Sequence, residues 1–166
     1  ASLGISVDPD VDRLALVNED GEMFGEEYTL VAVADYILQN KKGSAVSNLS
    51  SSMALRDVCE KHQSTYHPSA VGEVNVVAKM KEVNAVIGGE GNGGIIYPEL
   101  HFGRDALVGI ALFLSHLAKT GKSISFLRST YPNYEMIKGK IPLEAQTDVD
   151  GILAKLQAKY SNFEIN

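Results

Sequence analysis

Short apolar runs rich in β-branched residues alternate with longer helical patterns between residues 44 and 120, and this alternation constrains the fold most strongly. The expected strands cover residues 44–49, 65–67 and 85–87. The expected helices cover residues 26–40, 53–62, 74–83 and 104–119. Strands joined by helices favour parallel pairing, because the helix carries the chain back across the sheet. The pattern therefore predicts an α/β fold, a layered α/β/α domain with a mixed, partly parallel sheet.

A loop rich in carboxylates lies between two further strand-like runs near the start of the chain. Residues 3–7 and 14–17 are apolar and too short for helices, and between them stand Asp8, Asp10 and Asp12. Converged carboxylates repel one another unless a cation lies between them. Oxygen ligands without Cys or His suit magnesium, manganese or calcium rather than zinc. Arg13 follows the three carboxylates directly, and a metal with an arginine beside it is typical of a site for phosphoryl transfer.

The residues of this loop also match two other kinds of structure. Asp and Pro both favour turns, so the stretch could be a solvated turn, but alternating carboxylates followed by an arginine favour the metal loop. Asp8, Asp10, Asp12 and Glu19 also match acidic ligand positions of the helix-loop-helix calcium motif. That motif needs glycine where Arg13 stands, and helices where strands are expected, so we reject it.

A glycine-rich stretch, residues 88–94, follows the expected strand 85–87. In α/β sheets ligands bind at the carboxyl ends of the strands, which is where this stretch lies. Glycines let a ligand approach the backbone, while Glu90 and Asn92 offer an acceptor and a donor suited to sugar hydroxyls. A glycine-rich turn with an incidental acid remains open. A dinucleotide fingerprint is rejected, because Ile-Ile-Tyr-Pro follows where that motif must begin a helix.

The net charge and the cysteine count limit which binding partners and which cellular compartment are expected. A formal net charge of −6 argues against nucleic acid or an anionic membrane as a partner, so a phosphorylated ligand needs a metal, a local cation or helix N-termini. The single cysteine, Cys59, permits no internal disulfide and is typical of a reducing cytoplasm. Its position on an apolar helix face predicts a core residue rather than a nucleophile. No signal peptide or membrane-spanning run is visible.

The pattern changes after residue 132. A strand is expected over residues 136–143 and a helix over residues 148–160, with a domain junction near Pro142. Residues 162–166 look like the start of another strand, and the chain opens on a strand without an initial Met. Both ends lead us to expect a segment of a longer protein.

The two loops together resemble those of the α-D-phosphohexomutase superfamily, the phosphoglucomutase/phosphomannomutase group that includes phosphoglucosamine mutases. The resemblance rests on Asp-Pro-Asp-Val-Asp-Arg at 8–13, Gly-Glu-Gly-Asn-Gly at 89–93 and Arg-Asp at 104–105. It implies four domains around a deep cleft. Residues 1–23 would end domain II and carry the metal-binding loop, residues 24–142 would form domain III, which recognises the sugar, and residues 143–166 would be a linker and the start of domain IV. The chain would then be an α/β domain flanked by fragments of its neighbours.

The resemblance also implies roles for individual residues. It implies that Arg13 lies near the transferring phosphoryl group as a catalytic residue. The implied Mg2+ ligands are Asp8, Asp10 and Asp12. The implied sugar-binding residues are Glu90, Asn92, Gly89 and Gly91. The family more often has Ser at the position of Asn92, and His67 and His101 are open candidates for ligand contact.

The family reaction is the reversible transfer of a phosphate between the 1- and 6-positions of a hexose, through an enzyme phosphoserine and a bisphosphate intermediate. In the family the phosphoserine loop belongs to domain I, so we expect this segment alone to be inactive and to need domains I, II and IV of its parent chain. Glucose, mannose and glucosamine phosphates all remain open as substrates. The alternative is a non-catalytic module that binds sugar phosphate or a divalent ion. The apolar face expected on the helix 148–160 also predicts self-association of the segment.

Overall fold

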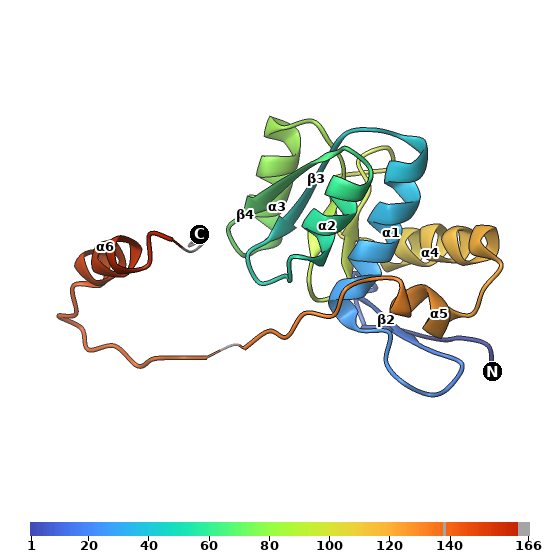
Figure 1. Ribbon diagram of the computed structural model, residues 1–166, viewed down its shortest axis with the longest axis horizontal. Helices are drawn as coiled ribbons and strands as arrows, with labels where there is room; N and C mark the ends of the chain where they lie inside the picture. The colour runs from blue at the N-terminus through green and yellow to red at the C-terminus, as the bar shows by residue number, and fades with distance from the viewer. Residues whose placement is uncertain (138, 163–166) are drawn as a thin grey trace. The chain divides into compact units, whose positions relative to one another are not determined.

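The structure is a computed structural model that describes residues 1–137 and 139–162 (Figure 1). The chain divides into two compact units, Ala1–Glu135 and Met136–Asn166. The first unit holds both predicted loops and the alternating strands and helices. Within the described ranges, no helix has the length and apolarity needed to cross a membrane.

The first unit is built on a four-stranded mixed sheet with the strand order β4-β3-β5-β6. Its strands are β3 (Ser44–Asn48), β4 (Thr65–Ser69), β5 (Ala85–Glu90) and β6 (Gly94–Ile96). β3 pairs in parallel with β4 and β5, whereas β6 runs antiparallel to β5. The predicted α/β fold with a mixed, partly parallel sheet is therefore confirmed.

The sheet extends further into the glycine-rich stretch than the sequence indicated. β5 continues through Glu90 instead of ending at residue 87, because Gly88 and Gly89 pair with β3 on one side and β6 on the other. A Cβ on Gly89 would collide with the carbonyl of Gly94, so glycine is needed for this close pairing. Glu90 is consequently the last residue of a central strand rather than a loop residue.

Four helices of the first unit match the predicted ones to within two residues at either end. They are α1 (Glu26–Asn40), α2 (Ala54–Lys61), α3 (Glu73–Glu82) and α4 (Ala106–Thr120). Asp105 caps the start of α4 by accepting a hydrogen bond from the Val108 amide, and Gly121 ends it in the left-handed conformation.

These helices cover both faces of the sheet. Successive side chains of a strand point to opposite faces, so apolar side chains on both faces need a covering layer. Val46 of β3 and Ile96 of β6 are buried with Met80 of α3 on one face. Their neighbours Ala45 and Ile95 belong to the larger core, which also takes in buried residues of α1, α2 and α4. The result is the layered arrangement that the alternation predicted.

The start of the chain forms an antiparallel hairpin of β1 (Gly4–Val7) and β2 (Leu14–Val17), in which Val7 lies opposite Leu14. Leu14 and Leu16 are buried in the larger core together with Phe24, so the hairpin is anchored to the α/β domain. The predicted succession of strand, loop and strand is present, and residues 8–13 form the connecting loop.

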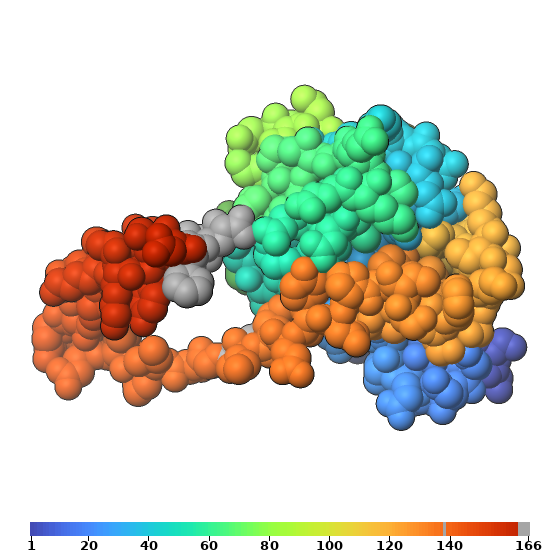
Figure 2. Space-filling model, in the orientation of Figure 1, coloured from blue at the N-terminus to red at the C-terminus, as the bar shows by residue number. Residues whose placement is uncertain are grey.

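A short helix that the sequence did not indicate, α5 (Ile124–Ser129), follows α4. The chain from α5 to residue 134 lies against α2 and the turn before α1 (Figure 2). Arg128 Nε donates to the Phe24 carbonyl oxygen at 3.0 Å, and the Tyr134 hydroxyl donates to Asp57 at 2.6 Å. These contacts attach the end of the first unit to its helical layer.

The second unit contains α6 (Val149–Lys159), whose first turn is capped by Asp148. None of the α6 residues is buried. The strand expected over residues 136–143 is wrong, since residues 136–137 and 139–143 adopt no strand conformation and position 138 lies outside the described residues. A strand needs a neighbouring strand to satisfy its backbone groups, and none is paired with this stretch among the described residues. The strand expected over residues 162–166 begins at Asn162, which lies in a turn, and its other positions, 163–166, lie outside the described residues.

Candidate functional site

The hairpin loop and the end of β5 meet at the carboxyl edge of the sheet. The backbone amide of Leu14 donates to the Gly93 carbonyl oxygen at 3.2 Å, and the Ala106 amide at the start of α4 donates to the Val11 carbonyl oxygen at 3.1 Å. A hollow of about 280 Å3 lies between the loops, and Asp8, Arg13 and Asn92 are among the residues that line it. The tertiary structure thus brings the two predicted loops to one place.

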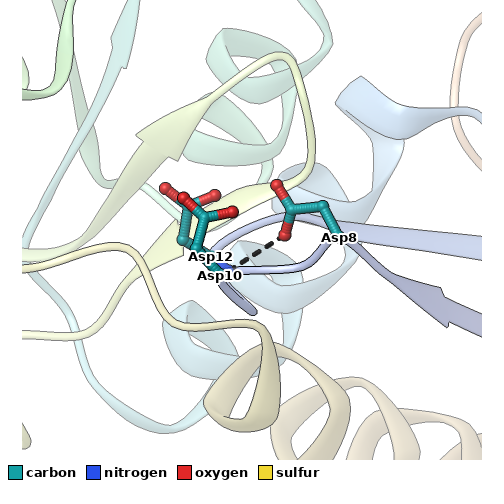
Figure 3. Close-up of side chains that lie close together, drawn as sticks. All are labelled: Asp8, Asp10 and Asp12. Carbon is teal, nitrogen blue, oxygen red and sulfur yellow. Dashed lines mark hydrogen bonds between the residues drawn. The ribbon is translucent and has the colours of Figure 1, made fainter.

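Asp8, Asp10 and Asp12 converge from the hairpin loop (Figure 3). Each offers one carboxylate oxygen, and these oxygens all lie within 4.8 Å of one another. Asp8 organises the loop, because its Oδ1 accepts hydrogen bonds from the backbone amides of Asp12 and Arg13, both at 3.1 Å. Val11, at the centre of the loop, adopts a left-handed backbone conformation with φ of 57°.

The surroundings of Asp8 and Asp12 shift the pKa values of these two carboxyl groups in opposite directions. The pKa of Asp12 is raised, chiefly by burial. The negative charges of Asp10 and Asp8 act in the same direction, whereas the guanidinium of Arg104 acts to lower the pKa. Burial also acts to raise the pKa of Asp8, but hydrogen bonds from the backbone amides of Arg13 and Asp12 outweigh it and the pKa is lowered.

The donor set fits a hard divalent cation. Asp12 Oδ1 is buried and accepts no hydrogen bond, although two other carboxylates lie beside it. A buried carboxylate oxygen without a hydrogen bond is costly unless a cation lies beside it. The guanidinium of Arg13 lies beside Oδ1, with its Nε 3.5 Å away. Magnesium prefers carboxylate oxygens, so the three aspartates are compatible with the predicted Mg2+ site.

Arg13 lies beside two of these carboxylates. Its Nε is 3.3 Å from Asp8 Oδ2 and 3.5 Å from Asp12 Oδ1, and its side chain is 52% exposed. Exposed ion pairs of this kind contribute little stability, so the guanidinium can exchange them for the oxygens of an anion at small cost. Its position on the rim of the hollow allows contact with a phosphoryl group.

Glu90 is held firmly at the end of β5. Its side chain is only 7% exposed, and both carboxylate oxygens accept hydrogen bonds. Oε1 accepts from Asn48 Nδ2 at 2.8 Å, and Oε2 accepts from Arg104 Nη1 at 3.0 Å and from Asn92 Nδ2 at 3.5 Å. A carboxylate oxygen can accept more than one hydrogen bond, so this orientation still permits a sugar hydroxyl to bind.

The remaining glycine loop is packed closely against its surroundings. Asn92 Oδ1 accepts a hydrogen bond from the Gly94 amide at 3.1 Å. Gly93 has a positive φ of 84°, and a Cβ there would collide with the Leu14 backbone. A Cβ on Gly91 would come within 2.9 Å of Ser51 Oγ. Contacts between protein segments therefore explain these glycines, whereas the predicted approach of a ligand to Gly89 and Gly91 stays a prediction.

Three residues at this edge were not assigned from the sequence: Asn48, Glu73 and Arg104. Asn48 ends β3, so the preference of ligands for the carboxyl ends of strands was a usable signal for it. Glu73 begins α3, and Arg104 precedes α4 and was noted only as part of the Arg-Asp pair. The contacts of Glu73 and Arg104 join segments far apart in the chain, so no local pattern indicated these two residues.

The two candidate histidines lie apart from the carboxylate cluster. His101 Nε2 is 3.0 Å from Asp105 Oδ2, and the His101 side chain is 46% exposed. His67 belongs to β4, where it pairs with Val46 of β3. Neither lines the hollow between the two loops, and a role in ligand contact stays a prediction for both.

The fold and the converged acidic loop define an α/β domain with a candidate metal centre at the carboxyl edge of its sheet. A family model described as phosphoglucomutase/phosphomannomutase, alpha/beta/alpha domain III, matches residues 25–134. The chain belongs to this family, within the α-D-phosphohexomutase superfamily. The predicted resemblance is thereby confirmed.

Individual relatives agree with the family. A phosphoglucomutase/phosphomannomutase of Thermococcus kodakarensis is 33% identical over 157 residues, which cover 94% of this chain and 34% of the relative. A probable phosphoglucosamine mutase of Methanopyrus kandleri is 30% identical over 168 residues, covering 99% of this chain and 37% of the relative. The crystal structure of a putative phosphomannomutase from Thermus thermophilus superposes with a TM-score of 0.72 at 27% identity, over 77% of this chain and 30% of that one. The chain thus spans about a third of the length of the curated relatives it matches.

Proposed function

We propose that this chain forms part of a magnesium-dependent phosphohexomutase that interconverts hexose 1-phosphate and hexose 6-phosphate. The observation that carries the proposal is the convergence of three carboxylates on one another in a chain of this family. One of them, Asp8, lines a hollow together with Arg13 and Asn92. In this proposal residues 1–23 end domain II, residues 24–142 form domain III and residues 143–166 begin domain IV. The phosphoserine is supplied by a part of the parent protein outside this chain, so the segment alone is inactive.

Each group at the site has a defined task in phosphoryl transfer. Asp8, Asp10 and Asp12 hold Mg2+, which supplies positive charge that offsets the oxygens of the transferring phosphoryl group. Arg13 donates hydrogen bonds to the same oxygens from the rim of the hollow. Glu90 accepts hydrogen bonds from sugar hydroxyls, and Asn92 adds an amide donor and acceptor. The fixed carboxylate of Glu90 orients the sugar, which lowers the entropic cost of bringing the reacting groups together.

The hexose itself stays open between glucose, mannose and glucosamine phosphates. Phosphoglucosamine is a specific second candidate, because the Methanopyrus kandleri relative and an Aliarcobacter butzleri relative that is 31% identical are both named as phosphoglucosamine mutases. A non-catalytic module that binds sugar phosphate or a divalent ion is the alternative to an enzyme.

The test is a turnover assay on the complete parent protein with glucose 1-phosphate, mannose 1-phosphate and glucosamine 1-phosphate, each with and without magnesium. Conversion to a 6-phosphate that requires magnesium supports the proposal and ranks the substrates. Asp10→Asn removes one metal ligand and is expected to abolish the magnesium-dependent turnover. Asp20→Asn makes the same change at an exposed position of the turn 18–22 and is expected to leave the magnesium-dependent turnover intact. Magnesium binding without conversion of any substrate would favour the binding module instead.

A further inference from the structure

Arg104 contacts carboxylates from three separate elements. Its Nη1 is 3.0 Å from Glu90 Oε2 at the end of β5, and its Nε is 3.1 Å from Glu73 Oε2 at the start of α3. Its Nη2 forms an ion pair with Asp12 Oδ2 in the hairpin loop. One guanidinium therefore joins a candidate metal ligand to the candidate sugar-binding carboxylate.

The position of Arg104 is fixed from its backbone outward. The residue forms an isolated antiparallel bridge with Ile96 of β6, and its amide donates to Glu73 Oε1 at 3.2 Å. The side chain lies directly over Gly94, where a Cβ would come 2.5 Å from Arg104 Cδ. Only 15% of the Arg104 side chain is exposed. The absence of a side chain at position 94 leaves the space that the arginine fills.

The chemistry of the guanidinium suits this arrangement. It is planar, stays charged at all accessible pH values and directs five N–H donors along fixed edges, so it can bind three carboxylates at once. A lysine carries the same charge but lacks the rigid fork. The arrangement also takes up Asp12 Oδ2, while the buried Oδ1 accepts no hydrogen bond and has the Arg13 Nε beside it at 3.5 Å, so its lone pairs stay available to a metal.

We propose that Arg104 is a positioning residue that couples the metal loop to the sugar-binding strand end. It holds Asp12 for the metal and Glu90 for the sugar with one rigid group, so that a change in charge at Asp12 reaches Glu90. Glu90 in turn accepts from Asn48 Nδ2 at 2.8 Å, which extends the connection to the end of β3. Charged hydrogen bonds in a buried chain polarise one another, which provides the physical coupling. The inference rests on the magnesium site proposed above.

The test uses the nuclear magnetic resonance spectrum of the isotopically labelled chain during titration with magnesium chloride. Two signals are followed: the backbone amide of Asp10, which reports metal binding, and the side-chain amide of Asn48, which reports the environment of Glu90. In the native chain both signals are expected to shift with the same magnesium dependence. A role for Arg104 in stability alone does not predict a magnesium-dependent shift at Asn48.

Two variants separate positioning from charge. Arg104→Lys keeps the charge but loses the fork, and Gly94→Ala displaces the arginine side chain without altering any charge. In both, the Asp10 signal is expected to respond to magnesium while the response of Asn48 is lost. The matched controls are Arg128→Lys, since Arg128 contacts the Phe24 carbonyl and Asn133, and Gly139→Ala, where an added Cβ meets nothing within 4 Å. Both controls are expected to retain the native responses.

The outcomes distinguish this inference from the proposed function. No response at Asp10 in the native chain would contradict the magnesium site itself. A response at Asp10 without one at Asn48 in the native chain would overturn only the coupling. If the Asn48 signal of Arg104→Lys and Gly94→Ala shifts with magnesium as it does in the native chain, the coupling is likewise overturned. If one of these variants fails to fold, as judged from its spectrum, the other decides.

Discussion

The backbone amide of Leu14 donates a hydrogen bond to the Gly93 carbonyl oxygen, 3.2 Å away, and thereby ties the strand that leaves the metal loop to the glycine loop. Gly93 accepts this neighbour only because it has no side chain and adopts a positive φ of 84°. The two candidate binding loops are therefore attached through their main chains as well as through Arg104.

Gly93→Ala tests this attachment. The substitution imposes a strained backbone conformation and a collision with Leu14, so we expect the free energy of unfolding to fall by about 2–5 kcal/mol. Gly21→Ala is the matched control, because Gly21 has φ of 90° but an added Cβ meets nothing within 4 Å. The control is expected to lose only about 1–2 kcal/mol of unfolding free energy, which is the cost of the backbone strain alone. Denaturant unfolding of both variants measures the difference, and equal losses would show that the contact with Leu14 is unimportant.

Asp35→Asn tests a buried polar network between α1, α2 and the chain after α5. Asp35 is 4% exposed and lies 3.0 Å from Lys61 Nζ, 2.5 Å from His62 Nε2 and 3.0 Å from the Tyr131 hydroxyl. Burial acts to raise the pKa of Asp35, but hydrogen bonds from His116, His62 and Lys61 outweigh it and lower the pKa. We expect the variant to lose about 1–3 kcal/mol at neutral pH, since it loses charged hydrogen bonds.

The same carboxylate makes stability depend on pH. The pKa of Asp35 is lower in the folded chain than its unfolded value of 3.8. The ionised carboxylate therefore stabilises the fold at pH values above 3.8, and this stabilisation is lost progressively as the pH falls below 3.8. Denaturant unfolding from about pH 7 to about pH 2 is expected to show a smaller acid loss for Asp35→Asn than for the native chain. Asp20→Asn, at an exposed position of the turn 18–22, is the control and should retain the native slope. If Asp35→Asn loses as much unfolding free energy in acid as the native chain does, Asp35 is not the carboxylate responsible for the pH dependence.

Cys59 is expected to be unreactive in the folded chain. It is 1% exposed on α2, and burial, with a smaller effect of the Glu60 charge, raises the pKa of its thiol to about 12. A thiol-reactive dye at about pH 8 should label it slowly in buffer and rapidly in denaturant, because the thiolate is the reactive form. Ser161→Cys places a second thiol at an exposed position and should be labelled at once. Rapid labelling of Cys59 in the native chain would contradict its place in the core.

Self-association of the isolated chain is expected through α6. Its apolar residues at helical spacing are all exposed, and they are Val149, Ile152, Leu153 and Leu156. Light scattering at rising concentration is expected to show an increasing apparent mass, which Leu153→Lys should reduce. Ala154→Lys adds the same charge at the neighbouring exposed position and should reduce it less. A mass that does not change with concentration would rule out this association.

Patterns of neighbouring residues were sufficient to predict much of the architecture. The alternation of β-branched runs and helical segments predicted the α/β class, since side-chain periodicity and capping residues act over a few positions. The acidic loop was likewise visible, because its carboxylates are close in the chain and hydrogen bonds from the loop's own backbone to Asp8 arrange it. Family membership followed from the order of the two loops and was confirmed by the family model.

Pairing between distant segments was decided only by the tertiary structure. β5 extends to Glu90 because β3 and β6 offer it hydrogen bonds, whereas residues 136–143, in the described part of that stretch, have no partner strand and form no strand. Glu90 and Asp12 share the guanidinium of Arg104 through contacts that no local pattern specifies. By itself the sequence determined which chemical groups the loops carry. The tertiary structure decided which of those groups meet, because ion pairs and hydrogen bonds form only where the register of the sheet and the packing of its helices place their partners within about 3 Å.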